Sequence, residues 1–167
     1  MPFVIDPWSP ADLQPVIDFI LGIQRGEFGV PITVADQPDI ADVPGWYGRG
    51  RGGFWVAREG DAVVGTIALL DHGSVERGEH EAALRKMFVR HDRRGAAHGV
   101  AEGLFSTLLG HARAAGLVTL RLGTRPEMRA AHRFYEKRGF VRIDAEALPP
   151  SFPRMKVDSV FYRIDLV

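Results

Sequence analysis

The stretch from Leu84 to Phe140 constrains the fold most, because strand-like and helical patterns alternate along it. Apolar residues over 82–90 and 118–122 predict strands, and the periodicity of 98–115 predicts an amphipathic helix between them. A second helix is expected over 127–138. A strand–helix–strand order is typical of parallel pairing, since a parallel connection needs a long crossover.

The first part of the chain has a different pattern. Ser9 is a candidate N-cap and Pro10 a favourable first residue for a helix over the apolar positions that follow. Residues 26–50 predict a loop with one short helix, and 71–80 predict a polar turn. The remaining expected strands are 2–6, 54–58, 63–70, 140–143 and 160–166. We therefore expect one domain over 1–167, of α/β class, with a central mixed sheet and helices on both faces.

Composition excludes several classes of function. The 167 residues contain no cysteine, which rules out disulfides, thiol nucleophiles and cysteine-bound metals. The 21 basic residues balance 21 acidic ones, so charge gives no reason to expect nucleic-acid or membrane binding. The six histidines lack metal-ligand spacing, so no metal is expected. Without an apolar run of about 18 residues or a leader pattern, a cytoplasmic protein is the expectation.

A glycine-containing turn links the strand over 82–90 to the following helix. Such a turn presents unpaired backbone N–H groups at the positive end of a helix dipole, which suits a pyrophosphate. The small residues there let a ligand approach the backbone, although a tight connection that binds nothing has the same pattern. The spacing of Gly95, Gly99 and Gly103 differs from the G-x-G-x-x-G of dinucleotide sites, and no P-loop pattern is present.

Two motifs in this stretch carry a family resemblance. Gly99-Val100-Ala101, preceded by Arg94-Gly95, is similar to the cofactor loop of the GNAT family of N-acetyltransferases. It especially resembles bacterial members with a longer R-G-x-x-x-G-V-A loop. The second family signature, A-x-x-F-Y-E-K-x-G-F, is complete as Ala131, Phe134, Tyr135, Glu136, Lys137, Gly139 and Phe140. The resemblance implies the acyl-CoA N-acyltransferase fold and acetyl-CoA as the second substrate.

The resemblance also implies roles for individual residues. Acetyl-CoA would lie where the strand ending at Val89 separates from the strand 118–122, with the backbone of Met87, Phe88 and Val89 along the pantetheine arm. A free N–H near Met87 would polarise the acetyl carbonyl, and Tyr135 would protonate the leaving thiolate. Thr124 would replace a missing asparagine contact. The pyrophosphate would be held by Arg94, Gly95, Ala96, Ala97, His98, Gly99, Val100 and Ala101.

The general base is the weakest point of the resemblance. The usual family glutamate would fall near Ala83, so Glu81 is the nearest candidate on the same strand face. Glu79, Asp71 and Glu27 are alternatives. Ordered water is another route for the proton.

The acceptor follows least directly from the sequence. Residues 26–55 are expected to wall its site with acidic and aromatic side chains: Glu27, Asp36, Asp39, Asp42, Phe28, Trp46, Tyr47 and Trp55. Asp158 and Ser159 are further candidates near the last strand. The acceptor is expected to be a small-molecule amine or a protein amino group, and a homodimer stays open. The alternatives are a non-catalytic acyl-CoA sensor and a nucleotide-binding enzyme.

Overall fold

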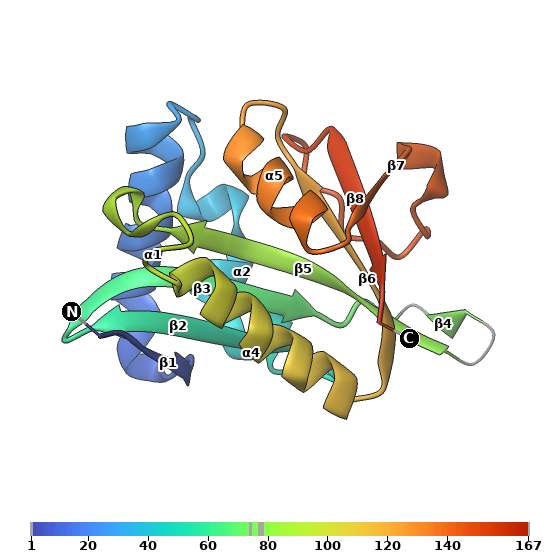
Figure 1. Ribbon diagram of the computed structural model, residues 1–167, viewed down its shortest axis with the longest axis horizontal. Coiled ribbons are helices and arrows are strands. Elements are labelled where there is room, and N and C mark those ends of the chain that lie inside the picture. The colour runs from blue at the N-terminus through green and yellow to red at the C-terminus, as the bar shows by residue number, and fades with distance from the viewer. Residues whose placement is uncertain (1, 74, 77–78, 167) are drawn as a thin grey trace.

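A computed structural model describes residues 2–73, 75–76 and 79–166. All described strands form one sheet with the order β1-β2-β3-β5-β6-β8-β7, and β4 pairs with β5 beside this path (Figure 1). The strands are β1 Val4–Pro7, β2 Gly53–Glu59, β3 Ala62–Leu70, β4 Val75–Glu76, β5 Glu79–Val89, β6 Leu117–Thr124, β7 Val141–Ile143 and β8 Val160–Asp165. The expected strands are therefore confirmed, with bounds shifted by a few residues.

The helical elements before β2 differ in part from expectation. The expected N-cap residue Ser9 forms a capping box with Asp12, whose carboxylate accepts the Ser9 N–H at 2.9 Å. A short 3-10 turn over Pro10–Asp12 precedes α1 Leu13–Leu21, which runs on into a π-helical turn, Gly22–Glu27. The loop prediction over 26–50 was incomplete, because this region holds α2 Pro38–Ala41 and α3 Val43–Tyr47 as well as a 3-10 turn, Val34–Asp36.

The turn predicted over 71–80 was wrong in part. β4 pairs antiparallel with the start of β5, so that Val75 lies opposite His80. Residues 74 and 77–78 of this prediction lie outside the described part of the chain. Asp71 forms the turn that precedes β4, since its carboxylate accepts the N–H groups of Arg51 and Gly73, each at 2.9 Å.

Helices cover both faces of the sheet, which confirms the expected architecture. One core lies beneath α4 Val100–Ala114 and α5 Arg129–Lys137, and contains Leu104, Phe105 and Tyr135. The other core lies beneath α1, α2 and α3, and includes Ile20 and Tyr47. The sheet thus lies between two hydrophobic cores, and each side chain of a central strand points into one core or the other.

The parallel pair at the centre of the sheet separates along its length. β5 and β6 pair from His80–Leu117 to Ala83–Arg121, and no later pair is described between them. Beyond this point β5 continues to pair with β3, and β6 continues to pair with β8. The facing edges of the two strands therefore diverge in the second half of β5.

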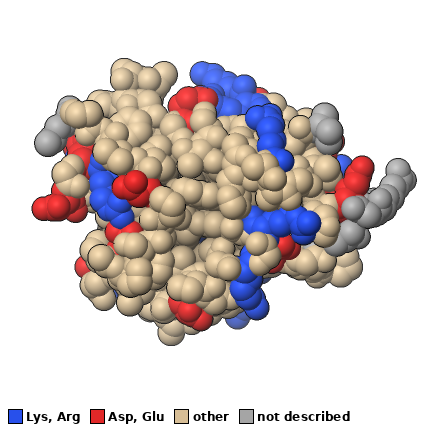
Figure 2. Space-filling model, turned by 90° about the horizontal axis from the view of Figure 1, so that it is seen from below, with Lys and Arg blue, Asp and Glu red and all other residues tan. Residues whose placement is uncertain are grey.

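The surface agrees with the balanced charge. On the face shown in Figure 2, basic and acidic side chains are interspersed, and no field of one sign covers it. Within the described ranges, no helix has the length and apolar character needed to cross a membrane.

Candidate active site

A cleft opens where β5 and β6 diverge. Its lining comes from Leu84–Phe88 of β5, from the end of β6 with the turn after it, and from α5. The segment 152–158 and part of 24–32 complete the wall. The cleft therefore brings together segments from both halves of the chain, which sequence spacing alone does not relate.

A β-bulge shapes the β5 wall of this cleft. Thr66 pairs with Phe88 and Ala68 pairs with Arg85, so Ile67 lies opposite the two residues between them. Of these two, Lys86 has φ +52°, which is strained for a residue with a side chain. The Thr66 hydroxyl donates to the Lys86 carbonyl at 2.7 Å and holds the bulge. A bulge takes backbone groups out of the ladder, so this part of β5 has polar groups for a ligand.

The loop before α4 provides a second set of backbone donors. Gly99 is the N-cap with φ +71°, which glycine adopts without steric cost. The first i to i−4 bond of the helix runs from the Gly103 N–H to the Gly99 carbonyl at 2.9 Å. The N–H groups of Val100, Ala101 and Glu102 therefore precede the helical ladder. Glycine and alanine leave these groups accessible to an anion.

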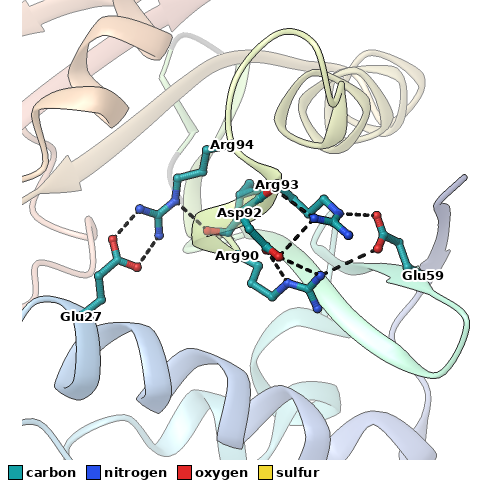
Figure 3. A network of polar contacts seen from close by, with 7 residues as sticks. Glu27, Glu59, Arg90, Asp92, Arg93 and Arg94 are labelled. Carbon is teal, nitrogen blue, oxygen red and sulfur yellow. Dashed lines mark hydrogen bonds and ion pairs between the residues drawn. The ribbon is translucent and has the colours of Figure 1, made fainter. Parts of the chain in front are cut away.

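Ion pairs anchor the same loop on both sides (Figure 3). Arg94 donates to the Val89 carbonyl at 2.8 Å and to both carboxylate oxygens of Glu27. On the other side, Arg93 donates to Glu59 at 2.6 Å. The hydrogen bond from Arg94 holds the pKa of Glu27 below its usual value. Because Arg94 is already paired with Glu27, the anion donors of this loop are the N–H groups of Val100, Ala101 and Glu102, which precede the helical ladder.

Tyr135 lies in the cleft, as the resemblance implies. Its ring packs on Phe140 with centroids 5.4 Å apart, and its side chain is buried from bulk solvent. Burial, reinforced by the charge of Asp158, raises the pKa of the Tyr135 phenol. The phenol therefore stays protonated at neutral pH, which suits a proton donor and excludes a base.

Asp158 supplies a carboxylate beside Tyr135. Gly123 in β6 has no side chain, and a Cβ there would meet the Asp158 carboxylate at 2.8 Å. Burial raises the pKa of Asp158, and the charges of Arg85 and Lys86 oppose this shift. From the sequence, Asp158 is only a candidate near the acceptor site, because nothing there shows that it lies against Gly123.

Lys86 is a site residue that the sequence analysis missed. Lys86 as a whole residue is 7% exposed. Its ammonium group donates to the Gln37 side chain at 2.7 Å and lies 3.4 Å from Asp39. Asp39 also accepts from the Tyr47 hydroxyl at 2.6 Å. Burial lowers the pKa of Lys86 to about 8, against the attraction of Asp39. The signal was present in the sequence, because Arg85 and Lys86 interrupt an otherwise apolar strand.

Glu81 does not reach the cleft. Its carboxylate pairs with the Arg121 guanidinium inside the protein, where the two side chains are 3% and 4% exposed. Glu81 is absent from the cleft lining, as are the alternatives Glu79, Asp71 and Glu27. The expectation of a base in β5 therefore lacks structural support, because the strands still pair at Glu81, before they diverge.

The remaining predicted residues divide into two groups. Met87, Phe88 and Thr124 line the cleft, with Met128 where the family has asparagine. Val89 lies beyond the lining and contacts Arg94. Of the acidic and aromatic residues of 26–55 expected to wall the acceptor site, the lining includes Phe28 only. Among the others, Glu27 pairs with Arg94, Asp36 and Asp42 accept hydrogen bonds from Thr33 and Gly45, and Trp55 packs on His111.

The residues of the cleft fit acetyl-CoA. The diverging edges of β5 and β6 have space for an extended chain, and the N-terminus of α4 offers donors for a diphosphate. Gly95 and Gly99 leave open space around the loop. Among the described residues, no group of three metal-ligating side chains comes together.

The fold and the cleft are those expected of an acyl-CoA N-acyltransferase, and comparison with known proteins supports this class. The sequence model of the Acetyltransferase (GNAT) family matches residues 17–140. This chain therefore belongs to the GNAT family of acetyltransferases. The reaction of such a domain moves the acetyl group of acetyl-CoA to an amine.

Individual relatives support the assignment. Rat N-acetyltransferase 8F1 is 31% identical over 128 residues, which are 74% of this chain and 57% of that protein. A GNAT acetyltransferase of Staphylococcus aureus Mu50 has a TM-score of 0.91 at 30% identity, covering 99% of this chain and 100% of its own. A Salmonella typhimurium protein solved with its cofactor acetyl-CoA shares the fold, with a TM-score of 0.68 at 17% identity and coverage of 99% and 94%.

This chain spans about half the length of the curated relatives it matches. The relatives come from mammals as well as bacteria, so the assignment to the bacterial members stays a prediction.

Proposed function

We propose that this chain transfers the acetyl group of acetyl-CoA to a primary amine by direct attack. The observation that carries the proposal is the cleft between β5 and β6, with Tyr135 in its wall. The loop before α4 follows directly from the end of β5. The pantetheine arm would lie along Met87 and Phe88, with Thr124 opposite. The diphosphate would lie against the loop Gly95–Ala101, whose ion-paired flanks keep its N–H groups in place.

Each proton of the reaction has a candidate group. The amine nitrogen bonds to the acetyl carbon, the carbon–sulfur bond breaks, and the thiolate takes a proton from the Tyr135 hydroxyl. The amine loses a proton to Asp158, whose carboxylate is the one that lies beside Tyr135 in the cleft. Burial raises the pKa of Asp158, which makes it a stronger base than an ordinary aspartate. An N–H of the bulge, at Met87, would polarise the acetyl carbonyl.

The test measures release of free CoA thiol from acetyl-CoA with a panel of amines, alongside thermal shift. We expect acetyl-CoA to raise the melting temperature and NAD(P) to leave it unchanged, because a ligand that binds only the folded state stabilises it. We expect Tyr135→Phe and Asp158→Asn to lower kcat by about 10²–10⁴-fold while acetyl-CoA still binds. Binding of acetyl-CoA without turnover of any amine would favour the acyl-CoA sensor instead.

The proposal includes a cytoplasmic location and an acceptor that is a small-molecule amine or a protein amino group.

A further inference from the structure

Two consecutive cations of β5 face the same side of the sheet. Leu84 and Met87 belong to the core beneath α4, whereas Lys86 reaches Asp39 beneath α1–α3. In a regular strand, Arg85 and Lys86 would point to opposite faces. The bulge cancels that alternation, and both residues line the cleft.

Arg85 lines the cleft, and its positive charge opposes the burial-driven rise in the pKa of the Tyr47 phenol, which lies in the core beneath α1–α3. The Arg85 guanidinium is also available to a ligand. No hydrogen bond or ion pair found in residues 2–73, 75–76 and 79–166 involves the Arg85 guanidinium. By contrast, Arg125 in the same cleft pairs with Glu127 at 3.0 Å. A half-buried guanidinium with five unused donors favours a planar anion that binds two of them.

Lys86 differs from Arg85, because its ammonium group is already held inside the protein. It donates to Gln37 at 2.7 Å and lies near Asp39. Lys86 therefore adds positive potential to this side of the cleft but leaves the direct contact to Arg85. A guanidinium can bind a carboxylate through two hydrogen bonds at once, which an ammonium group does less well, so Arg85 is the better candidate for the direct contact.

Arg85 and Asp158 define the two ends of a polar ligand. Arg85 and Asp158 both line the cleft, and the charge of Arg85 opposes the burial-driven rise in the pKa of Asp158. No ion pair joins them in the described structure, which leaves the space between them for a ligand. A molecule with an amine at one end and a carboxylate at the other matches this pair of charges.

Apolar side chains enclose the rest of this region. Phe28, Val30 and Ile32 line one wall, and Phe152 and Met155 line another. Burying apolar surface there contributes about 25 cal/mol per Å². The cleft thus offers a carboxylate site, a base and an apolar surface.

We propose that the acceptor is a free amino acid with an apolar side chain, whose carboxylate pairs with Arg85 while its amino group lies at Asp158. The inference rests on the proposed acetyl transfer and narrows its acceptor from amines in general to one class. Lysine side chains of folded proteins lack the adjacent carboxylate and would leave Arg85 unpaired.

The experiment compares L-phenylalanine, L-phenylalaninamide and phenethylamine at saturating acetyl-CoA. For each amine, kcat/KM is measured with the unchanged protein and with Arg85→Gln. Each substrate is compared with itself, so differences in amine basicity cancel. We expect Arg85→Gln to lower kcat/KM about ten- to a hundredfold for the amino acid and less than about threefold for the amide and the amine, as one charged hydrogen-bonded contact predicts.

Two further variants control the comparison. Arg113→Gln removes an exposed arginine from the last turn of α4 and should leave all three values unchanged. Arg85→Lys keeps the charge but not the planar fork, and should recover part of the loss. It also tests the inference if Arg85→Gln does not fold.

The outcomes separate the inference from the proposed function. Equal losses for all three substrates would overturn the inference and leave acetyl transfer standing. Absence of thiol release with every amine, including protein amines, would overturn acetyl transfer and the inference with it. Unchanged binding of acetyl-CoA by Arg85→Gln is expected, since the loop before α4 is intact.

Discussion

The buried pair of Glu81 and Arg121 allows a direct test of whether Glu81 serves structure or catalysis. The change is Glu81→Gln, which keeps the size of the side chain and removes its charge. Arg121 then remains inside the protein with its charge and without a carboxylate partner. Its Nε atom is already without a hydrogen-bond partner among the described residues, so little compensates the loss.

The expected cost follows from burial. A surface pair contributes about 0–1 kcal/mol, whereas breaking a buried pair costs about 3–5 kcal/mol because a charge is left without a partner. The side chains here are 3% and 4% exposed, so the larger range applies. For a chain of this size, each kcal/mol corresponds to about 2–4 °C, and we expect the melting temperature to fall by roughly 6–20 °C.

Urea unfolding and turnover are measured on the same preparations, below both melting temperatures. We expect kcat of Glu81→Gln to stay within about twofold, because Glu81 lies outside the cleft. The double variant Glu81→Leu with Arg121→Met removes both charges and should regain most of the stability. A hundredfold loss of kcat with unchanged stability would refute this reasoning and restore Glu81 as the base.

Three further changes test other parts of the site. Gly123→Ala should displace Asp158, because the new Cβ would lie 2.8 Å from its carboxylate, and should lower kcat at least tenfold in the thiol assay while acetyl-CoA binding persists. Gly99→Ala should lower the free energy of unfolding by about 1–2 kcal/mol and weaken CoA in calorimetry, since φ is +71° there; its matched control Gly110→Ala, within α4, should raise stability by about 0.5–1 kcal/mol. Because burial lowers the pKa of Lys86 to about 8 from 10.5, the unfolded chain binds more protons between these values. The free energy of unfolding should therefore rise with pH over this interval relative to Lys86→Met, by about 3 kcal/mol, and equal pH profiles in urea unfolding would contradict the shift.

The order of the elements could be predicted from the sequence because local patterns determine it. The helical period over 98–115 and the glycine that follows it indicate α4, and the motif around Tyr135 indicates α5. The position of β8 between β6 and β7 has no local signal, because strand order depends on long-range packing. Only one short helix was expected over 26–50, where the structure has α2 and α3, since so few residues give no measurable period.

The site was predictable on the cofactor side and less so on the acceptor side. The loop Gly95–Ala101 is a continuous segment whose conformation depends on its own glycines, so a motif identifies it. The acceptor side is assembled from β5, the segment 24–32 and the segment 152–158. Acidic residues of 26–55 looked functional in the sequence, but the structure uses Asp36 and Asp42 as local caps and Asp39 as a buried partner.

The β-bulge at Lys86, which adds one residue to β5, accounts for the position of the charged groups in the cleft. Without the bulge, alternation would place either Arg85 or Lys86 beneath α4, in a core that the structure fills with apolar side chains. The positive φ of Lys86 is therefore a local cost that places two cations on the acceptor side and releases backbone groups along the cofactor side. Thr66 holds this geometry through the Lys86 carbonyl, which makes it a positioning residue. The donor and acceptor sides of the cleft are thus coupled through the same short segment of strand.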